Sequence, residues 1–360
     1  FTVTTGIGGT GVVGILRNGD GPTVMLRADM DGLPVHEQTG LPYASTVMTE
    51  NRFGEVQPAM HACGHDIHMT SLVGAARQMS RRRDAWSGTL VLIAQPAEEL
   101  GLGAKAMIDD GLFDRFPRPD YVVALHDSAS LEAGKIAYSP GWALANVDSV
   151  DIYVQGIGGH GAYPQTTKDP VVIASQIVVA LQTLVSREVS PLEPAVVTVG
   201  AFNAGTKHNI ISDEAHLQLT VRSYTDEVRQ TLLAGIERIA RAQAISAGLP
   251  EDLYPRVEFE ETYTPATYND PALSNRLASS FRNRFGAENV IKADPVMGGE
   301  DFSFFLREKP GCYFFVGTNN ADRGLMWGHH HPRFDIDEEA LGIGVETMVR
   351  TLTGYLNCEA

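Results

Sequence analysis

The sequence predicts an α/β protein in which a catalytic domain with a mostly parallel sheet carries an inserted ferredoxin-like α+β domain. Three observations support this fold class. Apolar strands alternate with helices at both ends of the chain, a β-α-β-β-α-β run occupies the middle, and several strands end in residues that bind metals or move protons. We expect the catalytic domain to comprise residues 1–147 and 260–360, and the inserted domain, expected to serve as a lid and for dimerisation, to comprise residues 148–259.

The first third of the chain shows the strand and helix rhythm of a largely parallel sheet. Two apolar strands flank the turn Asn18-Gly19-Asp20-Gly21, and a helix with apolar residues at helical spacing begins near Ile67. Because strands then alternate with helices, the sheet should be mostly parallel. The expected strands span residues 11–16, 22–27, 89–95 and 121–125, and the expected helices span 67–79 and 103–111.

The pattern changes near residue 148 and returns after Pro265. In the middle segment, strands 150–155, 195–199, 215–222 and 256–261 and helices 170–186 and 225–247 follow the β-α-β-β-α-β order. The last segment predicts a helix at 271–285, a strand at 312–316 and a closing helix at 337–356.

Composition limits the kind of protein. A chain of 360 residues with a formal net charge of -16 lacks the basic patch that nucleic-acid binding requires. We find no uninterrupted apolar stretch of membrane-spanning length, so we expect no membrane partner. Cys63, Cys312 and Cys358 are far apart and too few to form a disulfide framework, which favours a reducing, cytoplasmic location. Because the chain starts with Phe1 inside an apparent strand, we expect a natural N-terminal segment to be absent from this sequence.

The segment Met60-His61-Ala62-Cys63-Gly64-His65-Asp66-Ile67-His68 places a thiol, three imidazoles and a carboxylate within a few residues. A lone cysteine is usually a small buried hydrophobe. This cysteine is surrounded by polar residues and glycine, which is a poor composition for a core. Thiolate and imidazole are preferred ligands of zinc and similar ions, so the metal-site interpretation is favoured.

Two apolar strands deliver further reactive residues at their carboxyl ends. Glu98 and Glu99 follow strand 89–95, and His126 follows strand 121–125. In isolation, two such acids most often form a solvated helix start, and the histidine would be either a hydrogen-bonded core residue or a ligand. At the carboxyl edge of an α/β sheet, one acid can bind a metal while its neighbour faces the attacking water.

Two more histidine clusters lie outside these strands. Gly328-His329-His330-His331-Pro332 is internal and precedes a helix, so a functional site is favoured over a tag remnant. The sequence leaves open which of its three imidazoles binds. Gly158-Gly159-His160-Gly161 is either a functional histidine on a flexible turn or an ordinary tight turn with a surface histidine.

Four of these motifs together resemble the M20 metallopeptidase superfamily. They are His61-Ala62-Cys63-Gly64-His65-Asp66, Gln95-Pro96-Ala97-Glu98-Glu99, Gly158-Gly159-His160-Gly161-Ala162 and His330-x-Pro332-x-Phe334-Asp335. The resemblance is to the amidohydrolase branch with hippurate hydrolases, N-acyl-amino-acid aminoacylases and auxin-conjugate hydrolases. It covers essentially the whole chain in order, including the inserted domain.

The resemblance implies a role for each matching residue. Two divalent metal ions (Zn, Mn, Co or Ni) would be bound with Cys63 as the bridging ligand, and Glu98 would be the general base. His160 would stabilise the oxyanion, often in the neighbouring subunit's site, because the family's inserted domain also forms the dimer contact. Asn209 and Arg222 match substrate-holding positions, although a turn asparagine and a solvent-facing arginine are the open alternatives. The implied metal ligands are Cys63, His65, Glu99, His126 and His330.

The implied reaction is hydrolysis of an N-acyl-L-amino acid to a carboxylic acid and a free amino acid. A dipeptidase or carboxypeptidase of the same superfamily and a catalytically silent metal-binding protein are the alternatives. The peptidase branches tend to carry Asp where this chain has Cys63, which favours the acyl substrate. The chain departs from the family in lacking the N-terminal helical segment, in having Gln165 where a second histidine is frequent, and in having Asp127 where an apolar residue is common.

Overall fold

A computed structural model describes residues 1–356, so Cys358 lies outside the described part of the chain. The chain forms two compact units. Unit 1 contains Phe1–Ala143, Thr267–Pro295 and the chain from Glu300 onward, and unit 2 contains Leu144–Ala266 and Val296–Gly299. The predicted boundaries are 147/148 and 259/260, whereas unit 2 begins at Leu144, extends to Ala266 and also includes Val296–Gly299. The assignment of a catalytic and a lid or dimerisation role to the two units stays a prediction.

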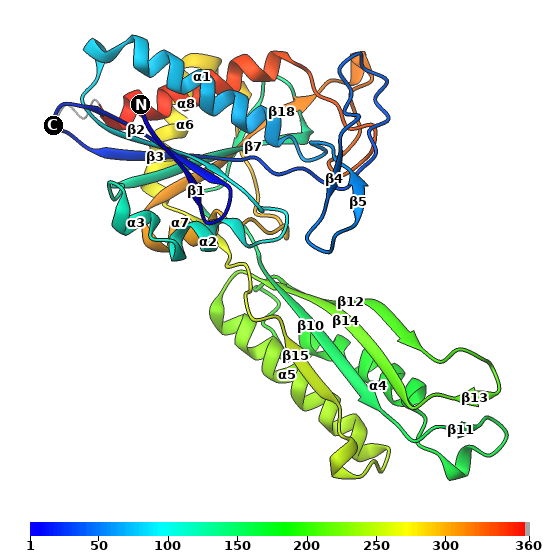
Figure 1. The fold of residues 1–360 in the computed structure, drawn as a ribbon. Coiled ribbons are helices and arrows are strands. Elements are labelled where there is room, and N and C mark those ends of the chain that lie inside the picture. Colours follow the sequence, from blue (N-terminus) through cyan, green and yellow to red (C-terminus); the bar gives the residue numbers. More distant parts are fainter. Residues whose placement is uncertain (357–360) are drawn as a thin grey trace. The chain divides into compact units, whose positions relative to one another are not determined.

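Unit 1 is built on an eight-stranded sheet of order β1-β2-β6-β3-β7-β18-β8-β17 (Figure 1). Its central strands β6, β3, β7 and β18 run parallel, which confirms the mostly parallel α/β fold. Such strands are covered on both faces, and β3 and β6 accordingly have almost continuously buried side chains. The bounds are β1 Thr2–Ile7, β2 Gly11–Asn18, β3 Thr23–Asp29, β6 Gly88–Gln95, β7 Tyr121–Glu132, β8 Ile136–Tyr138, β17 Val290–Lys292 and β18 Gly311–Asn319.

Helices cover both faces of this sheet (Figure 1). The long helices α1, α6 and α8 lie on one face, and their apolar sides form the main core with strand residues such as Leu26, Val123 and Phe314. The short helices α2, α3 and α7 lie on the other face. The bounds are α1 His65–Arg81, α2 Gly103–Asp109, α3 Leu112–Arg115, α6 Pro271–Phe285, α7 Ser303–Glu308 and α8 Glu339–Leu356.

Unit 2 has the expected order β10-α4-β12-β14-α5-β15 and an antiparallel sheet of order β12-β14-β10-β15. Both helices pack on this sheet through side chains such as Ile173, Ile177, Leu232 and Ile236. The ferredoxin-like arrangement is therefore present. The bounds are β10 Asn146–Gln155, α4 Pro170–Thr183, β12 Ala195–Ala204, β14 Glu214–Ser223, α5 Asp226–Ser246 and β15 Arg256–Phe259, with a π-helical turn at Leu184–Glu188.

Short polar residues explain where three of the helices begin. Asp169, Thr225 and Asp270 precede α4, α5 and α6, and each side chain accepts a backbone N–H of the first turn. Proline follows Asp169 and Asp270 at the first helical position, where its missing N–H costs nothing. The remaining short strands are β4 Met48–Glu50, β5 Val56–Pro58, β9 Gly141–Leu144, β11 Gly159–His160, β13 Ile210–Ile211 and β16 Thr267–Asn269.

Two strand predictions need correction. The Asn18–Gly21 turn joins β2 to β3, but β6 lies between them and pairs with both. β2 and β3 therefore do not form a hairpin, because β6, whose side chains are almost all buried, lies between them in the sheet. The strand that contains His126 does not end at residue 125. Instead, β7 continues to Glu132, because β18 pairs with it over this length.

No apolar stretch long enough to span a membrane was expected from the sequence, but one helical segment reaches that length. Residues Pro170–Glu188, with a mean hydropathy of 1.4, are long and apolar enough to cross a membrane by length and composition. The sequence-based search missed it because Ser175 and Gln176 interrupt the apolar run. Core helices of globular proteins meet the same criterion, and α4 buries Ile173, Ile177 and Leu181 in unit 2.

The contact between α1 and α8 yields a stability prediction. A Cβ atom at Gly74 of α1 would lie 2.3 Å from Val345 Cγ2 of α8, so Gly74→Ala should overpack this contact and lower the free energy of unfolding by about 1–3 kcal/mol. Gly342→Ala in α8 is the matched control, because no atom lies within 4 Å of its added Cβ. It should raise stability by up to about 1 kcal/mol through helix propensity. Urea unfolding followed by circular dichroism measures both, and equal effects of the two variants would contradict the close packing.

Candidate metal centre

The candidate site lies at one edge of the unit 1 sheet, beside the carboxyl ends of β3 and β6. Asp29 is the last residue of β3, and Glu98 and Glu99 follow β6. His126 lies within β7, just beyond the segment paired with β3. Cys63 and His65 flank Gly64, which precedes α1. This edge is where open α/β sheets bind ligands.

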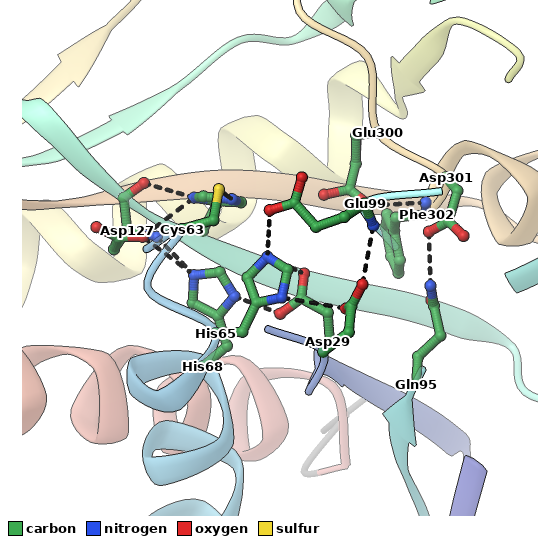
Figure 2. Close-up of polar contacts among 12 residues, drawn as sticks. Asp29, Cys63, His65, His68, Gln95, Glu99, Asp127, Glu300, Asp301 and Phe302 are labelled. Atoms are coloured by element: carbon green, nitrogen blue, oxygen red, sulfur yellow. Dashed lines mark hydrogen bonds and ion pairs between the residues drawn. The ribbon is translucent and has the colours of Figure 1, made fainter. Parts of the chain in front are cut away.

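The structure brings together all five residues that the resemblance implies as metal ligands. Cys63, His65 and His126 have donor atoms within 4.8 Å of one another, as do Cys63, Glu99 and His330. Cys63 Sγ lies 3.7 Å from His126 Nε2, and Glu99 Oε1 lies 3.5 Å from His330 Nε2 and 3.9 Å from His65 Nε2. The Glu99 carboxylate faces the His65 ring, with Cys63 nearby (Figure 2). Cys63 belongs to both groups, as a bridging ligand would.

Backbone geometry at the site is unusual. In the described chain, Ala97 (φ 53°) and His330 (φ 65°) are the only non-glycine residues with positive φ. Such conformations cost about 1–3 kcal/mol and persist where surrounding contacts impose them. The His330 N–H donates to Ala62 O at 2.7 Å, which ties this loop to the cysteine turn. Both strained residues belong to segments that supply proposed ligands.

The structure also indicates which histidine of the cluster 329–331 faces the other ligands. His330 does so, whereas His329 Nε2 lies 2.9 Å from Asp127 Oδ2 and His331 stacks on Trp327 with ring centroids 4.2 Å apart. The sequence alone left this choice open.

His68 offers no free nitrogen, although it lies beside these residues. Its Nδ1 lies 2.5 Å from Asp29 Oδ1, and its Nε2 accepts the Asp127 N–H at 2.9 Å. The amide can only donate, so the ring carries its proton on Nδ1. His68 therefore supports the site instead of binding a metal.

Unsatisfied polar atoms test whether the site fits metal ions. His65 Nδ1 and Nε2 and Glu99 Oε1 are buried without a hydrogen-bond partner in the described chain. Buried polar atoms normally have partners, because an unmade hydrogen bond costs free energy. Thiolate, imidazole and carboxylate are suitable donors for borderline divalent cations. The residues present therefore fit the implied metals.

Burial and neighbouring charges shift the pKa values of the site. Burial raises the pKa of the Cys63 thiol to about 12. Burial lowers the pKa of His65, but the charge of Asp29 and the proximity of Asp31 and Cys63 outweigh this effect and raise the pKa to about 10. Burial, followed by the charges of Glu300 and Asp301, raises the pKa of Glu98 well above its ordinary value. The raised pKa values mean that Cys63 and His65 must release protons when they bind a metal ion.

Sequence reasoning missed the residues that support the ligands. Asp31 Oδ1 lies 3.2 Å from His65 Nδ1, and Asp31 Oδ2 accepts the Glu99 N–H at 3.0 Å. Asp29 lies 3.7 Å from His65 and also bonds His68 (Figure 2). Both acids follow the apolar run of β3, so the carboxyl-edge argument that selected Glu98 and Glu99 would also have found them.

The fully buried Arg27 holds residues at this edge of the sheet in place. Arg27 Nη1 donates to Asp29 Oδ2 at 2.6 Å, and its other nitrogens bond Gln95, Glu300 and Asp301. Glu300 also accepts the Tyr313 hydroxyl. A buried cation needs such compensation, and here the carboxylates that compensate it also lie beside the site.

The other predicted residues belong to unit 2. His160 is exposed on β11, its Nδ1 accepts the Ala162 N–H at 3.1 Å, and the Gly161 N–H donates to Asn209 O at 2.9 Å. His160 and Asn209 are therefore neighbours. Arg222 lies near the far end of β14 and donates to Met297 O at 2.7 Å and Thr220 Oγ1 at 3.2 Å. The structure does not bring Arg222 to the other two, and all three roles stay predictions.

Comparison with known proteins adds independent information. Residues 25–354 match the sequence profile of Peptidase family M20/M25/M40. YhaA of Bacillus subtilis (strain 168), whose name describes it as an amidohydrolase, is 40% identical over 94% of this chain and 82% of its own length. Thermostable carboxypeptidase 1 of Saccharolobus solfataricus is 38% identical over 93% of this chain and 81% of its own length. N-acetylcysteine deacetylase of B. subtilis is 37% identical over 93% and 82%, respectively.

A solved structure shows the same architecture. The YXEP protein of B. subtilis, described as a dinuclear metal binding peptidase from the M20 family, superposes with a TM-score of 0.80 at 31% identity. The match covers 99% of this chain and 88% of that one. The profile match, these relatives and the fold agree: this chain is a hydrolase that belongs to Peptidase family M20/M25/M40.

Proposed function

We propose that this enzyme hydrolyses the amide bond of N-acyl-L-amino acids with two divalent metal ions held by Cys63, His65, Glu99, His126 and His330. The observation that carries the proposal is the convergence of these donors, several of them without hydrogen-bond partners, beside Glu98. The N-acetylcysteine deacetylase relative supports the substrate class. Zn, Mn, Co and Ni all suit the donor set, and Cys63 is assigned as the bridging ligand.

Divalent ions at these donors would polarise the amide carbonyl and lower the pKa of the attacking water. Glu98 takes the water proton and delivers it to the leaving nitrogen. Burial raises the pKa of Glu98 above its ordinary value, which makes this carboxylate a stronger base than an exposed one. His160 donates a hydrogen bond to the oxyanion of the tetrahedral intermediate, while Asn209 and Arg222 hold the substrate.

A substrate panel tests this function against the peptidase alternative. The carboxypeptidase relative gives the alternative its support. We expect N-acetyl- and N-benzoyl-amino acids to be hydrolysed faster than dipeptides with a free amino group. Faster hydrolysis of the dipeptides would favour the peptidase. Absence of hydrolysis with every metal tested would favour a catalytically silent metal-binding protein. The presence of Glu98 beside the proposed ligand Glu99 argues against that role, because metal binding alone needs no general base.

We propose that two copies associate through unit 2 as a homodimer. Strand β12 is at the edge of its sheet, with one row of backbone groups available for pairing. The outer face of the neighbouring helix α4 exposes Val172 and Val179, the latter with 71% of its surface accessible. An open edge beside exposed apolar side chains suits a second copy of the same surface.

We also propose a cytoplasmic location. Cys63 and Cys312 are both free thiols in the described chain, which suits a reducing compartment. The proposed ligand role of Cys63 likewise requires that it stay reduced.

Replacement of Glu98 tests the general base. Glu98→Gln keeps the shape of the side chain but cannot accept a proton, so kcat should fall about 10²–10⁴-fold or more. Metal content, measured by mass spectrometry, should equal that of the wild type, because Glu98 is not a proposed ligand. Retention of activity in this variant would remove Glu98 from its role.

Metal affinity should rise with pH. With its pKa near 12, the Cys63 thiol is protonated at neutral pH and must lose its proton to bind a metal. Each proton displaced makes the apparent affinity about tenfold tighter per pH unit below that pKa. Competition with a chelator between pH 6 and 8 measures this slope. A flat profile would contradict thiolate ligation.

Mixed dimers test both His160 and the dimer. His160→Ala should lower kcat about 10²–10³-fold. If His160 acts in the partner's site, mixing this variant with Glu98→Gln after dissociation should restore up to about a quarter of wild-type activity, because mixed dimers contain one intact site. No recovery, with mixed dimers present by native mass spectrometry, would place His160 in its own subunit's site.

A further inference from the structure

Asp127 is a buried carboxylate beside the proposed ligand His126, and the reaction described above does not use it. Its side chain is fully buried. Asp127 Oδ2 accepts hydrogen bonds from His329 Nε2 at 2.9 Å and from Thr318 Oγ1 at 3.2 Å. The carboxylate therefore has specific hydrogen-bond partners.

The backbone of Asp127 has separate duties. Its N–H donates to His68 Nε2, and its carbonyl accepts His126 Nδ1–H at 2.6 Å. The second contact leaves His126 Nε2 facing Cys63. A substitution at residue 127 would keep both backbone contacts. The side chain alone is responsible for the bond to His329.

His329 directly precedes the proposed ligand His330. His330 has the left-handed backbone conformation, and its N–H is fixed to Ala62 O. The ring of His329 is held by Asp127 and packs against His126 and Phe334, with centroids 5.3 and 5.0 Å away. The loop is thus fixed at two consecutive residues, and these two attachments set the direction in which the His330 side chain points.

Asp127 also contacts the turn on the other side of the site. A Cβ atom at Gly64 would lie 2.1 Å from Asp127 Oδ1, so the carboxylate packs directly on the backbone between Cys63 and His65. One side chain therefore touches the turn that supplies two proposed ligands and the loop that supplies a third.

We propose that Asp127 is a positioning residue that, through His329, orients His330 toward Glu99 and Cys63 and so strengthens metal binding. The inference rests on the proposed function, because it takes His330 as a ligand. Partners of this kind in the outer shell of metal sites typically change metal affinity about 10–100-fold when they are removed.

Metal titration of four variants and one control variant tests this role. The variants Asp127→Val and His329→Leu are each titrated with Mn²⁺ or Zn²⁺ in competition with a chelator. Of the two bound ions, the one held more weakly should bind about 10–100-fold less tightly in each variant. The double variant should lose less affinity than the sum of the two single losses, because both variants remove the contact between Asp127 and His329. Asp127→Asn keeps an oxygen acceptor for His329 and should retain most of the affinity. Asp151→Val is the matched control, because Asp151 also bonds a histidine, His216, but lies in unit 2. It should leave affinity unchanged.

The results separate the possible failures. Wild-type protein that does not bind two metal ions would overturn the proposed function itself. Two ions bound equally well by wild type, Asp127→Val and His329→Leu would overturn only the inference, as would additive losses in the double variant. If Asp127→Val fails to fold, the partly exposed His329→Leu and the conservative Asp127→Asn still decide. A lower melting temperature of the metal-free variants with unchanged affinity would show a merely structural role and overturn the proposal.

Discussion

The burial of Arg27 constrains the whole catalytic edge of unit 1. A guanidinium without solvent access must be surrounded by anionic and polar partners, and here these come from its own strand and from two distant segments. Asp29 belongs to the same strand, Gln95 to the next strand, and Glu300 and Asp301 to the segment before α7. Compensating one charge thereby fixes the ends of two central strands, and the ligand-bearing segments begin where these strands end (Figure 2).

A second layer of contacts passes this order on to the ligands. Asp29 holds His68, which receives the Asp127 N–H, and Asp31 lies against His65 and the Glu99 amide. Asp29 accepts a hydrogen bond from the His68 ring, and Asp31 accepts one from the Glu99 backbone N–H. Ring nitrogens of the proposed histidine ligands stay directed toward the candidate metal site. The proposed ligands are thus oriented by neighbours whose own positions are determined by the sheet, which is the arrangement that metal sites require.

The fold and the cluster of proposed ligands could largely be predicted from the sequence, because each depends on local patterns. Apolar periodicity located α1, α5 and β6, and reactive residues after apolar strands indicated Glu98, Glu99 and His126. The place of β6 between β2 and β3 could not be predicted, because strand order depends on long-range pairing. The choice of His330 over its neighbours was also out of reach, since it depends on a positive φ and on the partners of His329 and His331. Arg27 was missed because a single arginine in an apolar strand gives no sign of its partners 200 to 300 residues later.

The burial of Cys63 has a chemical consequence for the enzyme before it acquires its ions. Oxidants and electrophiles attack thiolates far faster than thiols, and burial keeps this sulfur protonated. A newly folded chain therefore holds its most vulnerable atom in an unreactive form. The same atom becomes a strong donor when a cation displaces the proton, so burial protects the sulfur chemically without preventing its later use.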